Sequence, residues 1–436
     1  MSNKTNEKEQ FSSIIGFLMV AIGFAVGIGS LWRFPYLCGA NGGAVFILVY
    51  ILVILIIGIP LLTAEITMGF HTQKTAINAY KEIKPDKKWY LAGYLHLIAA
   101  ISIAAYTIPI YAWILNYIPK TASGFFIGMS ATEVANYFAT FSADYKLIFF
   151  YAIITYVLEF IVLRGGLQNG VEKLSKVLLP TLAVIMVIVI ICGLRLDNAS
   201  AGIMFILKPD FSKFTMESLL AALGQAFFAI GIGMLASMVF GSYIADKKEN
   251  ILKDASVIST SIIVVGIAAG FMIFPMVFSF GLEPTAGSGL TFITLPNVFN
   301  KITGGRIIGT LFYLGFYIAA FTSSTSIIEA VVGVVMDQLN LSRMKALSLV
   351  MAIIVLIGIP SILSNNFFTI IDMVTNNYII VAGAFIISIF TGWIWGIDNC
   401  LDAANVKNKI MRMWITISVK YVSPIAIIII FVTSVL

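Results

Sequence analysis

A stretch near the N-terminus has the composition of a ligand-binding backbone inside a membrane. Residues Gly23–Pro35 (GFAVGIGSLWRFP) lie within the first long apolar segment, yet they include three glycines within seven residues, an arginine and a proline. A membrane-spanning helix usually excludes such residues, because an unpaired amide or carbonyl in hydrocarbon costs several kcal/mol. We therefore predict a helix that unwinds here and whose free backbone groups bind a ligand.

Five consecutive hydroxyl side chains, Thr322–Ser326, are the second group that could do chemistry. Helix packing does not need so many, although each hydroxyl could simply bond to a carbonyl one turn earlier in its own helix. Thr322 and Ser323, together with carbonyls freed in the unwound helix, would supply about five hard oxygen ligands without a full charge. Such an oxygen set suits Na⁺.

Charged residues inside apolar segments are costly and by default functional. Arg33 needs an anion, and Asp372 is a plausible partner, so the two could form an external gate or a static ion pair. Glu65 is expected to accept hydrogen bonds from the unwound backbone. Glu159 and Glu329 are expected either at helix ends or facing polar cavities.

Patterns for enzyme chemistry are absent from the sequence. No Ser/His/Asp or Cys/His arrangement lies where water would be available for hydrolysis. The three cysteines have no paired spacing, and the two histidines, His71 and His96, are far from any metal-binding pattern. We expect both histidines to be surface or packing residues, and we expect no catalytic residues.

The chain that must position these groups is predicted to be an all-α polytopic membrane protein. Its 436 residues are 60% hydrophobic and 11% charged, with a mean hydropathy of +0.99, which excludes a soluble globular domain. Strand-like alternation is absent, which argues against a membrane β-barrel. Apolar runs long enough to cross roughly 30 Å of hydrocarbon predict eleven transmembrane helices, at about residues 12–37, 44–70, 89–119, 147–164, 171–195, 217–244, 255–281, 306–337, 344–364, 369–396 and 414–436.

The distribution of Lys and Arg predicts the orientation. With the N-terminus inside, 18 of these residues lie on the cytoplasmic side and 7 on the opposite side. We expect a cell-membrane protein with a cytoplasmic N-terminus and, because the number of spans is odd, an external C-terminus. The net charge of +6 lies mostly in short loops and indicates contact with a lipid bilayer, not with nucleic acid.

Two similar glycine-containing motifs predict an internal structural repeat. Ala229–Met234 (AIGIGM) resembles Ala25–Ser30 (AVGIGS) five spans earlier. Two glycine-interrupted helices at corresponding positions are typical of inverted repeats, although glycine pairs can also merely permit close helix packing. We predict one transporter domain over residues 1–436, with five-helix repeats at 12–195 and 217–396 and broken first and sixth helices. Residues 414–436 would form an additional helix.

Several motifs together resemble the neurotransmitter:sodium symporter family, in particular its eleven-helix bacterial amino-acid transporters. The most specific are Gly27–Tyr36 (GIGSLWRFPY) followed by Asn41–Gly43 (NGG), and Gly58–Leu61 (GIPL) with Glu65. Gly224–Phe228 (GQAFF) and Phe321–Ser324 (FTSS) also match, and the resemblance covers nearly the whole chain.

The resemblance implies a set of binding residues. The family's second sodium site would use the carbonyls of Gly23, Val26 and Ala319 and the hydroxyls of Thr322 and Ser323. The substrate carboxylate would meet the amides of Ile28 and Gly29, at the positive end of a half-helix. Its amine would meet carbonyls around Ala25 and Phe228, and Phe228 would also form an aromatic lid. The side-chain pocket would be shaped by Gly231, Met234, Ile103, Ser323 and Ile327.

The resemblance also implies two gates: Arg33 with Asp372 outside, and Lys8 with Asp337 inside. Tyr243 would lie near the inner gate, with Phe11 where the family usually has Trp. The usual carboxylate-binding tyrosine of the third span falls at Thr107, next to Tyr106, and Pro109 could shift the helix so that Tyr106 serves instead.

Other departures concern the ions. The family's first sodium site maps onto Ser30, Ala229 and Ser261, where each change removes or weakens an oxygen ligand, so this site is expected to be degraded or absent. In the chloride region Tyr50 and Gln225 persist, but Val265 or Gly266 replaces the acid of many bacterial members. Chloride dependence therefore stays open.

Our interpretation is a sodium-coupled importer of a small amino acid or related zwitterion, using one Na⁺ and working by alternating access. Monoamine carriers of the family have Asp at the position of Gly27, so its absence favours a substrate with its own carboxylate. A hydrophobic or aromatic amino acid is favoured. The alternatives are a proton-coupled amino-acid or amine transporter of related architecture, and a non-transporting receptor or sensor. The sequence leaves monomer and dimer open.

Overall fold

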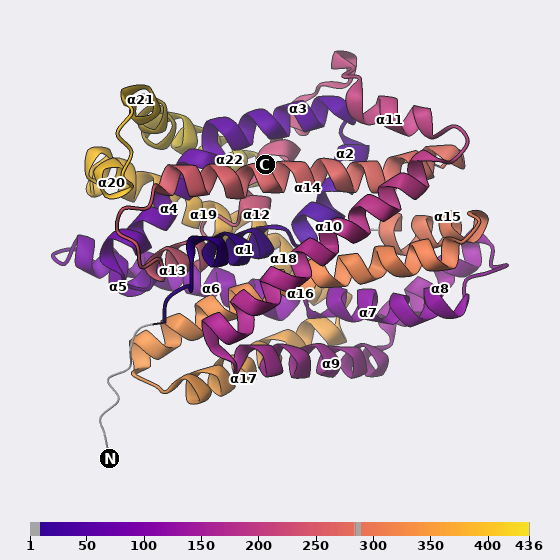
Figure 1. The fold of residues 1–436 in the computed structure, drawn as a ribbon, viewed down its shortest axis with the longest axis horizontal. Helices are drawn as coiled ribbons and strands as arrows, with labels where there is room; N and C mark the ends of the chain where they lie inside the picture. The colour runs from indigo at the N-terminus through magenta and orange to yellow at the C-terminus, as the bar shows by residue number, and fades with distance from the viewer. Residues whose placement is uncertain (1–8, 283, 285–288, 436) are drawn as a thin grey trace.

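The computed structural model describes residues 9–282, 284 and 289–435, and in these residues all regular structure is helical. Figure 1 shows the long helices lying roughly along one axis, with α5 (Ala76–Ile83) and α20 (Ile397–Ala403) at its left end. The right end carries α8 (Ala131–Ala143), α11 (Ala199–Leu207) and α15 (Leu295–Lys301). We call these the α5 end and the α8 end.

The long helices follow the expected spans closely, and several are divided into two segments. They are α1 (Ile14–Ala25) with α2 (Phe34–Ala40), α3 (Ala44–Val53) with α4 (Ile59–Thr72), α6 (Tyr90–Tyr106) with α7 (Ile108–Ser123), α9 (Tyr145–Leu163), α10 (Lys173–Leu194), α12 (Met216–Ile230) with α13 (Ala236–Ser242), α14 (Ile251–Ser279), α16 (Gly305–Leu339), α17 (Arg343–Leu363), α18 (Asn365–Val374) with α19 (Ile380–Ile389), and α21 (Lys409–Ile417) with α22 (Ser423–Val435).

The all-α, multi-span fold is confirmed, but the count of eleven is not. Within the described part of the chain, nine helices are long and apolar enough to cross a membrane, or ten if the bent pair Ile14–Ala25 and Gly29–Ala40 is one span. The expected sixth span is divided into α12 and α13, and the apolar α12 is only 15 residues long. An eleventh span therefore stays a prediction, as do the repeats at 12–195 and 217–396.

The first span breaks where its glycines predicted. α1 ends at Ala25, Val26 leaves the helical region (φ −87°, ψ 72°), and the chain resumes in η1 (Gly29–Arg33) with a bend of 48°. Free carbonyls at the end of one segment and free amides at the start of the next follow directly from this interruption.

The sixth span breaks over Gly231–Leu235. Gly231 and Gly233 have φ of +74° and +78°, which glycine adopts without a steric penalty. Leu235 also has a positive φ (+74°, with ψ −44°), and the Ala236 amide bonds to the Met234 carbonyl at 2.8 Å. This tight three-residue turn is strained for a branched side chain, and such strain is typical of functional sites.

α16 is the central helix and α9 is peripheral. In the most apolar window of α16, 89% of residues are buried, compared with 28% in α9. α1, α7 and α10 all pack against α16. The side chains of Thr322–Ser326, on α16, therefore lie in the middle of the bundle and face protein, not lipid.

Candidate functional site

A cavity of about 50 Å³ lies where both broken spans meet α16 and the α6–α7 junction. We call it the central cavity; its lining is mostly apolar and contains no charged side chain. Its walls are Phe24, Ala25, Gly27, Ile28, Gly29, Ile103, Thr107, Tyr111, Phe228, Ala229, Gly231, Met234, Ser323, Ser324 and Ile327. Ten of the eleven residues predicted to bind substrate are brought together here, and only Tyr106 lies elsewhere. Their contact with a substrate stays a prediction.

Glycine is required in the wall because the helices approach closely. A Cβ on Gly27 would lie 2.6 Å from the hydroxyl of Ser323, and one on Gly29 would lie 2.9 Å from the ring of Phe228. A Cβ on Gly231 would meet the Phe24 ring at 2.4 Å. Gly27 thus allows α1 to contact α16, in addition to leaving the cavity without an acid.

Side chains from two other helices satisfy part of the unwound backbone. The hydroxyl of Ser323 donates to the Phe24 carbonyl at 2.7 Å, and Gln225 Nε2 donates to the Gly29 carbonyl at 2.8 Å. The hydroxyl of Ser30 donates weakly to the Ala25 carbonyl at 3.4 Å. The amides of Ile28 and Gly29 begin the second half of the span, where a helix has no internal partners for its amides.

Three of the five predicted sodium ligands, Gly23, Ala319 and Thr322, lie close together at the contact of α1 with α16. A Cβ on Gly23 would lie 3.6 Å from Thr322 Cβ, and the Thr322 hydroxyl lies 3.1 Å from the Ala319 carbonyl. The same Gly23 position lies 3.4 Å from the hydroxyl of Ser175, a buried group on α10 without a hydrogen-bond partner among the described residues. A set of uncharged oxygen ligands, with one nearby hydroxyl that has no hydrogen-bond partner, suits Na⁺. Sequence reasoning missed Ser175, because only packing brings α10 to this point.

The structure distinguishes Thr107 from Tyr106. Thr107 lines the central cavity, and its hydroxyl donates to the Ile103 carbonyl at 2.7 Å and lies 3.3 Å from Tyr111 Oη. Tyr106 is buried away from the cavity, and its hydroxyl accepts a hydrogen bond from Asn376 at 3.1 Å. In this conformation Pro109 does not turn Tyr106 toward the cavity, and contact of Tyr106 with substrate stays a prediction. Tyr111, one turn further on, supplies the aromatic hydroxyl of this wall instead.

Two buried side chains bond to the backbone of Gly233 in the unwound part of the sixth span. Glu65 accepts from the Gly233 amide at 3.1 Å, as predicted. His96 Nδ1 lies 2.9 Å from the Gly233 carbonyl and must donate to it, so Nε2 is free to accept from the Tyr80 hydroxyl at 3.0 Å. Of the two expectations for His96, surface or packing, the structure shows packing: its ring is fully buried and both ring nitrogens are hydrogen bonded.

Replacing His96 by leucine is expected to destabilise the protein by ~1–3 kcal/mol, the usual cost of leaving a buried hydrogen-bonding group unsatisfied. The Gly233 carbonyl and the Tyr80 hydroxyl would both lose their partner. Thermal unfolding of the purified variant measures the effect. His71→Leu, at an exposed position, is the control. An equal loss of stability in both variants would contradict the role given to His96.

At the α8 end, Arg33 and Asp372 do not form an ion pair in the described structure. The guanidinium of Arg33 lies 4.8 Å from the ring centroid of Phe228, a cation–π arrangement over the predicted lid. Asp372 instead accepts from Asn376 at 2.7 Å. Arg33 thus covers Phe228 in this conformation, and closure of an Arg33–Asp372 gate stays a prediction.

At the α5 end, the predicted partner Lys8 lies outside the described residues. Asp337 accepts from Thr75 at 2.5 Å and from Asn78 at 2.9 Å, both at the start of α5. Tyr243 does lie beside Phe11, whose amide donates to the Tyr243 carbonyl at 3.1 Å and whose ring is 6.1 Å away.

The sequence did not indicate the ion pairs that close this end. Arg343 bonds to Glu9 at 2.7 Å, to the buried Glu329 at 2.5 Å and to the Leu163 carbonyl at 2.7 Å. Glu329 was recognisable as a costly buried acid, but its partner is the first residue of α17, the next helix, and is brought near only by folding.

Residues at the other two ion positions differ in how their polar groups are engaged. Ser261 is half-buried and donates to the carbonyl of Val257 in its own helix at 2.8 Å. In the chloride region, Tyr50 Oη and Gln225 Oε1 are buried without a partner among the described residues. Degradation of the first sodium site stays a prediction, and chloride dependence stays open.

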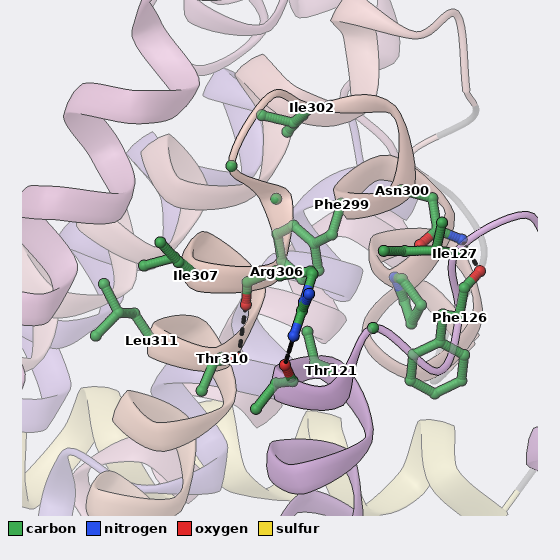
Figure 2. Close-up of a pocket in the computed structure, with 15 residues that line it drawn as sticks. Thr121, Phe126, Ile127, Phe299, Asn300, Ile302, Arg306, Ile307, Thr310 and Leu311 are labelled. Carbon is green, nitrogen blue, oxygen red and sulfur yellow. Dashed lines mark hydrogen bonds between the residues drawn. The ribbon is translucent and has the colours of Figure 1, made fainter.

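A second hollow is larger than the central cavity. It has a volume of about 670 Å³ and lies at the α8 end, between the end of α7, α15 and the start of α16. Figure 2 shows its wall, where Arg306 Nη2 donates to the Ala122 carbonyl at 2.6 Å and Asn300 bonds to the Phe126 carbonyl at 2.5 Å. None of the predicted binding residues lines this hollow, and the Arg306 guanidinium in its wall already donates to the Ala122 carbonyl.

The model of the sodium:neurotransmitter symporter family matches residues 8–137 and 142–436. The uncharacterized sodium-dependent transporter YhdH of Bacillus subtilis is 34% identical over 441 residues, covering 97% of this chain and 96% of its own. An uncharacterized sodium-dependent transporter of Haemophilus influenzae is 31% identical over 458 residues, covering 100% of both.

A solved structure is similar over its whole length. The crystal structure of MhsT in complex with L-phenylalanine superposes with a TM-score of 0.90 at 33% identity, covering 98% of this chain and 100% of that one. More distantly, the human sodium- and chloride-dependent creatine transporter 1 is 26% identical over 397 residues, covering 77% of this chain and 61% of its own.

Proposed function

Because the chain belongs to the sodium:neurotransmitter symporter family, whose members are sodium-dependent transporters and not enzymes, we propose that it imports an amino acid or related zwitterion with Na⁺. The observation that carries the proposal is the central cavity, which has no charged side chain but is bordered by two broken helices. A zwitterion can pair its own charges with the free amides and carbonyls of the breaks. A lone amine would find no acid there.

A hydrophobic or aromatic substrate is favoured. Phe24, Ile103, Phe228, Met234 and Ile327 line the cavity with apolar side chains. The similar protein MhsT was crystallised with L-phenylalanine, which supports the same substrate class for this chain. We propose one Na⁺, held by the carbonyls of Gly23, Val26 and Ala319 and the hydroxyls of Thr322 and Ser323.

Alternating access would move the first span relative to α16 around this ion. Na⁺ joins groups from α1 and α16, so it stabilises the arrangement in which these helices are in contact. We propose a cytoplasmic N-terminus and an external C-terminus, so that the α5 end faces the cytoplasm and the α8 end faces outside.

Uptake by proteoliposomes in Na⁺ or K⁺ buffer tests the proposal. We expect radiolabelled phenylalanine or another apolar amino acid to accumulate only with an inward Na⁺ gradient. Uptake that ignores sodium but stops with a protonophore would favour the proton-coupled alternative. Binding without counterflow would favour a receptor. If no amino acid stabilises the protein against heat more in Na⁺ than in K⁺, sodium coupling is contradicted.

A further inference from the structure

A buried carboxyl group lies just behind the wall of the central cavity. Glu159 belongs to the peripheral helix α9 and is 0% exposed, whereas its neighbours Val157, Leu158 and Ile161 are exposed on the outer face. It lies in the buried stripe of α9 with Ala152, Thr155 and Leu163. The one acid of this span is therefore turned inward, toward α7 and α16.

Hydroxyl groups surround this carboxyl. Ser324 of α16 donates to Glu159 Oε1, whereas Glu159 Oε2 has no partner among the described residues. Tyr111 from α7, Tyr156 from α9 and Tyr317 from α16 are the titratable side chains that interact with it electrostatically. The hydroxyl of Tyr156 is likewise buried without a partner in the described structure.

No cation compensates Glu159 in the part of the chain that the structure describes. Its carboxyl takes part in none of the ion pairs there. Arg343 reaches α9 only at the Leu163 carbonyl, one turn further on, and pairs with Glu9 and Glu329. In η3 (Leu167–Glu172), which also packs on α9, Glu172 pairs with Lys176.

An ionised carboxylate in this position would be very costly. It would have one hydroxyl donor, no counter-ion and no contact with bulk water. In this conformation the protonated, neutral form of Glu159 has the lower free energy.

Ser324 links this proton to the transport site. Its side chain lines the central cavity and also contacts Glu159. A hydroxyl can accept one hydrogen bond while it donates another, so Ser324 can turn to accept from the acid and donate to water in the cavity. Ser324 also directly follows Thr322 and Ser323, so Na⁺ at the proposed site would place a positive charge close to Glu159 and favour its ionised form.

We propose that Glu159 is a proton-binding site that releases its proton when Na⁺ binds, so that a proton moves opposite to sodium in the transport cycle. The O–H bond of the acid breaks, Ser324 takes that proton and gives its own to water in the cavity, and the carboxylate remains paired electrostatically with Na⁺. This inference rests on the proposed sodium coupling.

Sodium titration of the purified full chain at several pH values tests the proposal. The apparent Na⁺ affinity is followed by thermal stabilisation between about pH 6 and pH 8, with K⁺ keeping the ionic strength constant. For one proton released per Na⁺, the wild-type Kd should rise by up to about ten-fold for each unit that pH falls. Glu159→Gln keeps an acceptor for Ser324 but cannot titrate, so it should bind Na⁺ without this pH dependence.

Asp254→Asn is the matched control. Asp254 is also a buried carboxyl with an unpartnered oxygen among the described residues, but it lies at the start of α14 and not at the cavity. Its variant should keep the wild-type pH dependence. In weakly buffered solution, an indicator dye should report up to about one proton released per Na⁺ by the wild type and none by Glu159→Gln.

Each possible result contradicts a different claim. Wild-type sodium affinity that is independent of pH, or a Glu159→Gln protein that keeps the dependence, overturns the proton site but leaves sodium coupling intact. Loss of the dependence in Asp254→Asn overturns the assignment to Glu159. No stabilisation by sodium at any pH contradicts the proposed function itself. If Glu159→Gln does not fold, dye measurements on the wild type decide, and the absence of proton release overturns the proposal.

Discussion

Replacing Thr322 and Ser323 together by alanine is expected to abolish sodium-dependent binding and uptake. The double variant removes both side-chain ligands proposed for Na⁺, and with Ser323 it removes the hydrogen bond to the Phe24 carbonyl that joins α16 to α1. At ~1.5–3 kcal/mol for each contact to a charged group, the loss amounts to about 3 kcal/mol or more. The apparent sodium affinity should therefore fall by about 100-fold or more.

Two variants make this result specific. Ser326→Ala removes a buried hydroxyl from the same helix that has no partner in the described structure, so it should leave sodium binding unchanged. Ser30→Ala should also have little effect, because the first sodium site is expected to be degraded. If Ser30→Ala lost sodium binding as completely as the double variant, a working first site would have to be accepted.

The second large effect is expected at the α5 end. Arg343→Gln should destabilise the protein by ~3–5 kcal/mol, because it leaves the fully buried Glu329 without its cation. The same substitution releases Glu9, whose carboxylate also accepts from the Leu167 amide at 3.0 Å and so helps hold residues 9–11 at this end. A large fall in the thermal unfolding midpoint is the measurement.

A second substitution, which removes the charge of Glu329, distinguishes the stability lost to an unpaired charge from the stability lost with packing. Adding Glu329→Gln to Arg343→Gln leaves two neutral side chains and should recover most of the lost stability. Arg412→Gln is the control, since Arg412 pairs with Asp398 and Asp402, which are 83% and 71% exposed. Exposed pairs of this kind contribute roughly 0–1 kcal/mol. A double variant no more stable than Arg343→Gln would contradict the explanation.

The broken helices were predictable because the membrane restricts the alternatives. A glycine-rich interruption next to Arg33 and Pro35 cannot be an ordinary span, and the structure shows the break at Val26–Ile28. The second break, at Gly231–Leu235, was predictable from its likeness to the first. The strained turn at Leu235 was not, since nothing in the residue type marks a leucine for a positive φ.

Partners of buried polar groups were less predictable. Glu65 was correctly expected to contact unwound backbone, but His96 on the other side of Gly233 was assigned to packing. Arg33 was expected beside Asp372 from charge and from the family resemblance, whereas in this conformation it lies over Phe228. Charge identifies a group that needs a partner, but many partners satisfy that need equally well, and only the packing of the helices selects one.

From the residues alone we predict the class of fold, the positions of the long apolar helices, an interruption within Gly23–Pro35, a second at Ala229–Met234, and the hydroxyl-rich segment Thr322–Ser326. These features follow from hydropathy, chain length and backbone freedom, which are local properties. The tertiary structure alone decided that Thr107 and not Tyr106 lines the cavity, that Ser175 faces Gly23, and that Glu159 lies behind Ser324. Neighbouring residues on a helix point about 100° apart, so the side that faces the cavity depends on how each helix is rotated in the bundle.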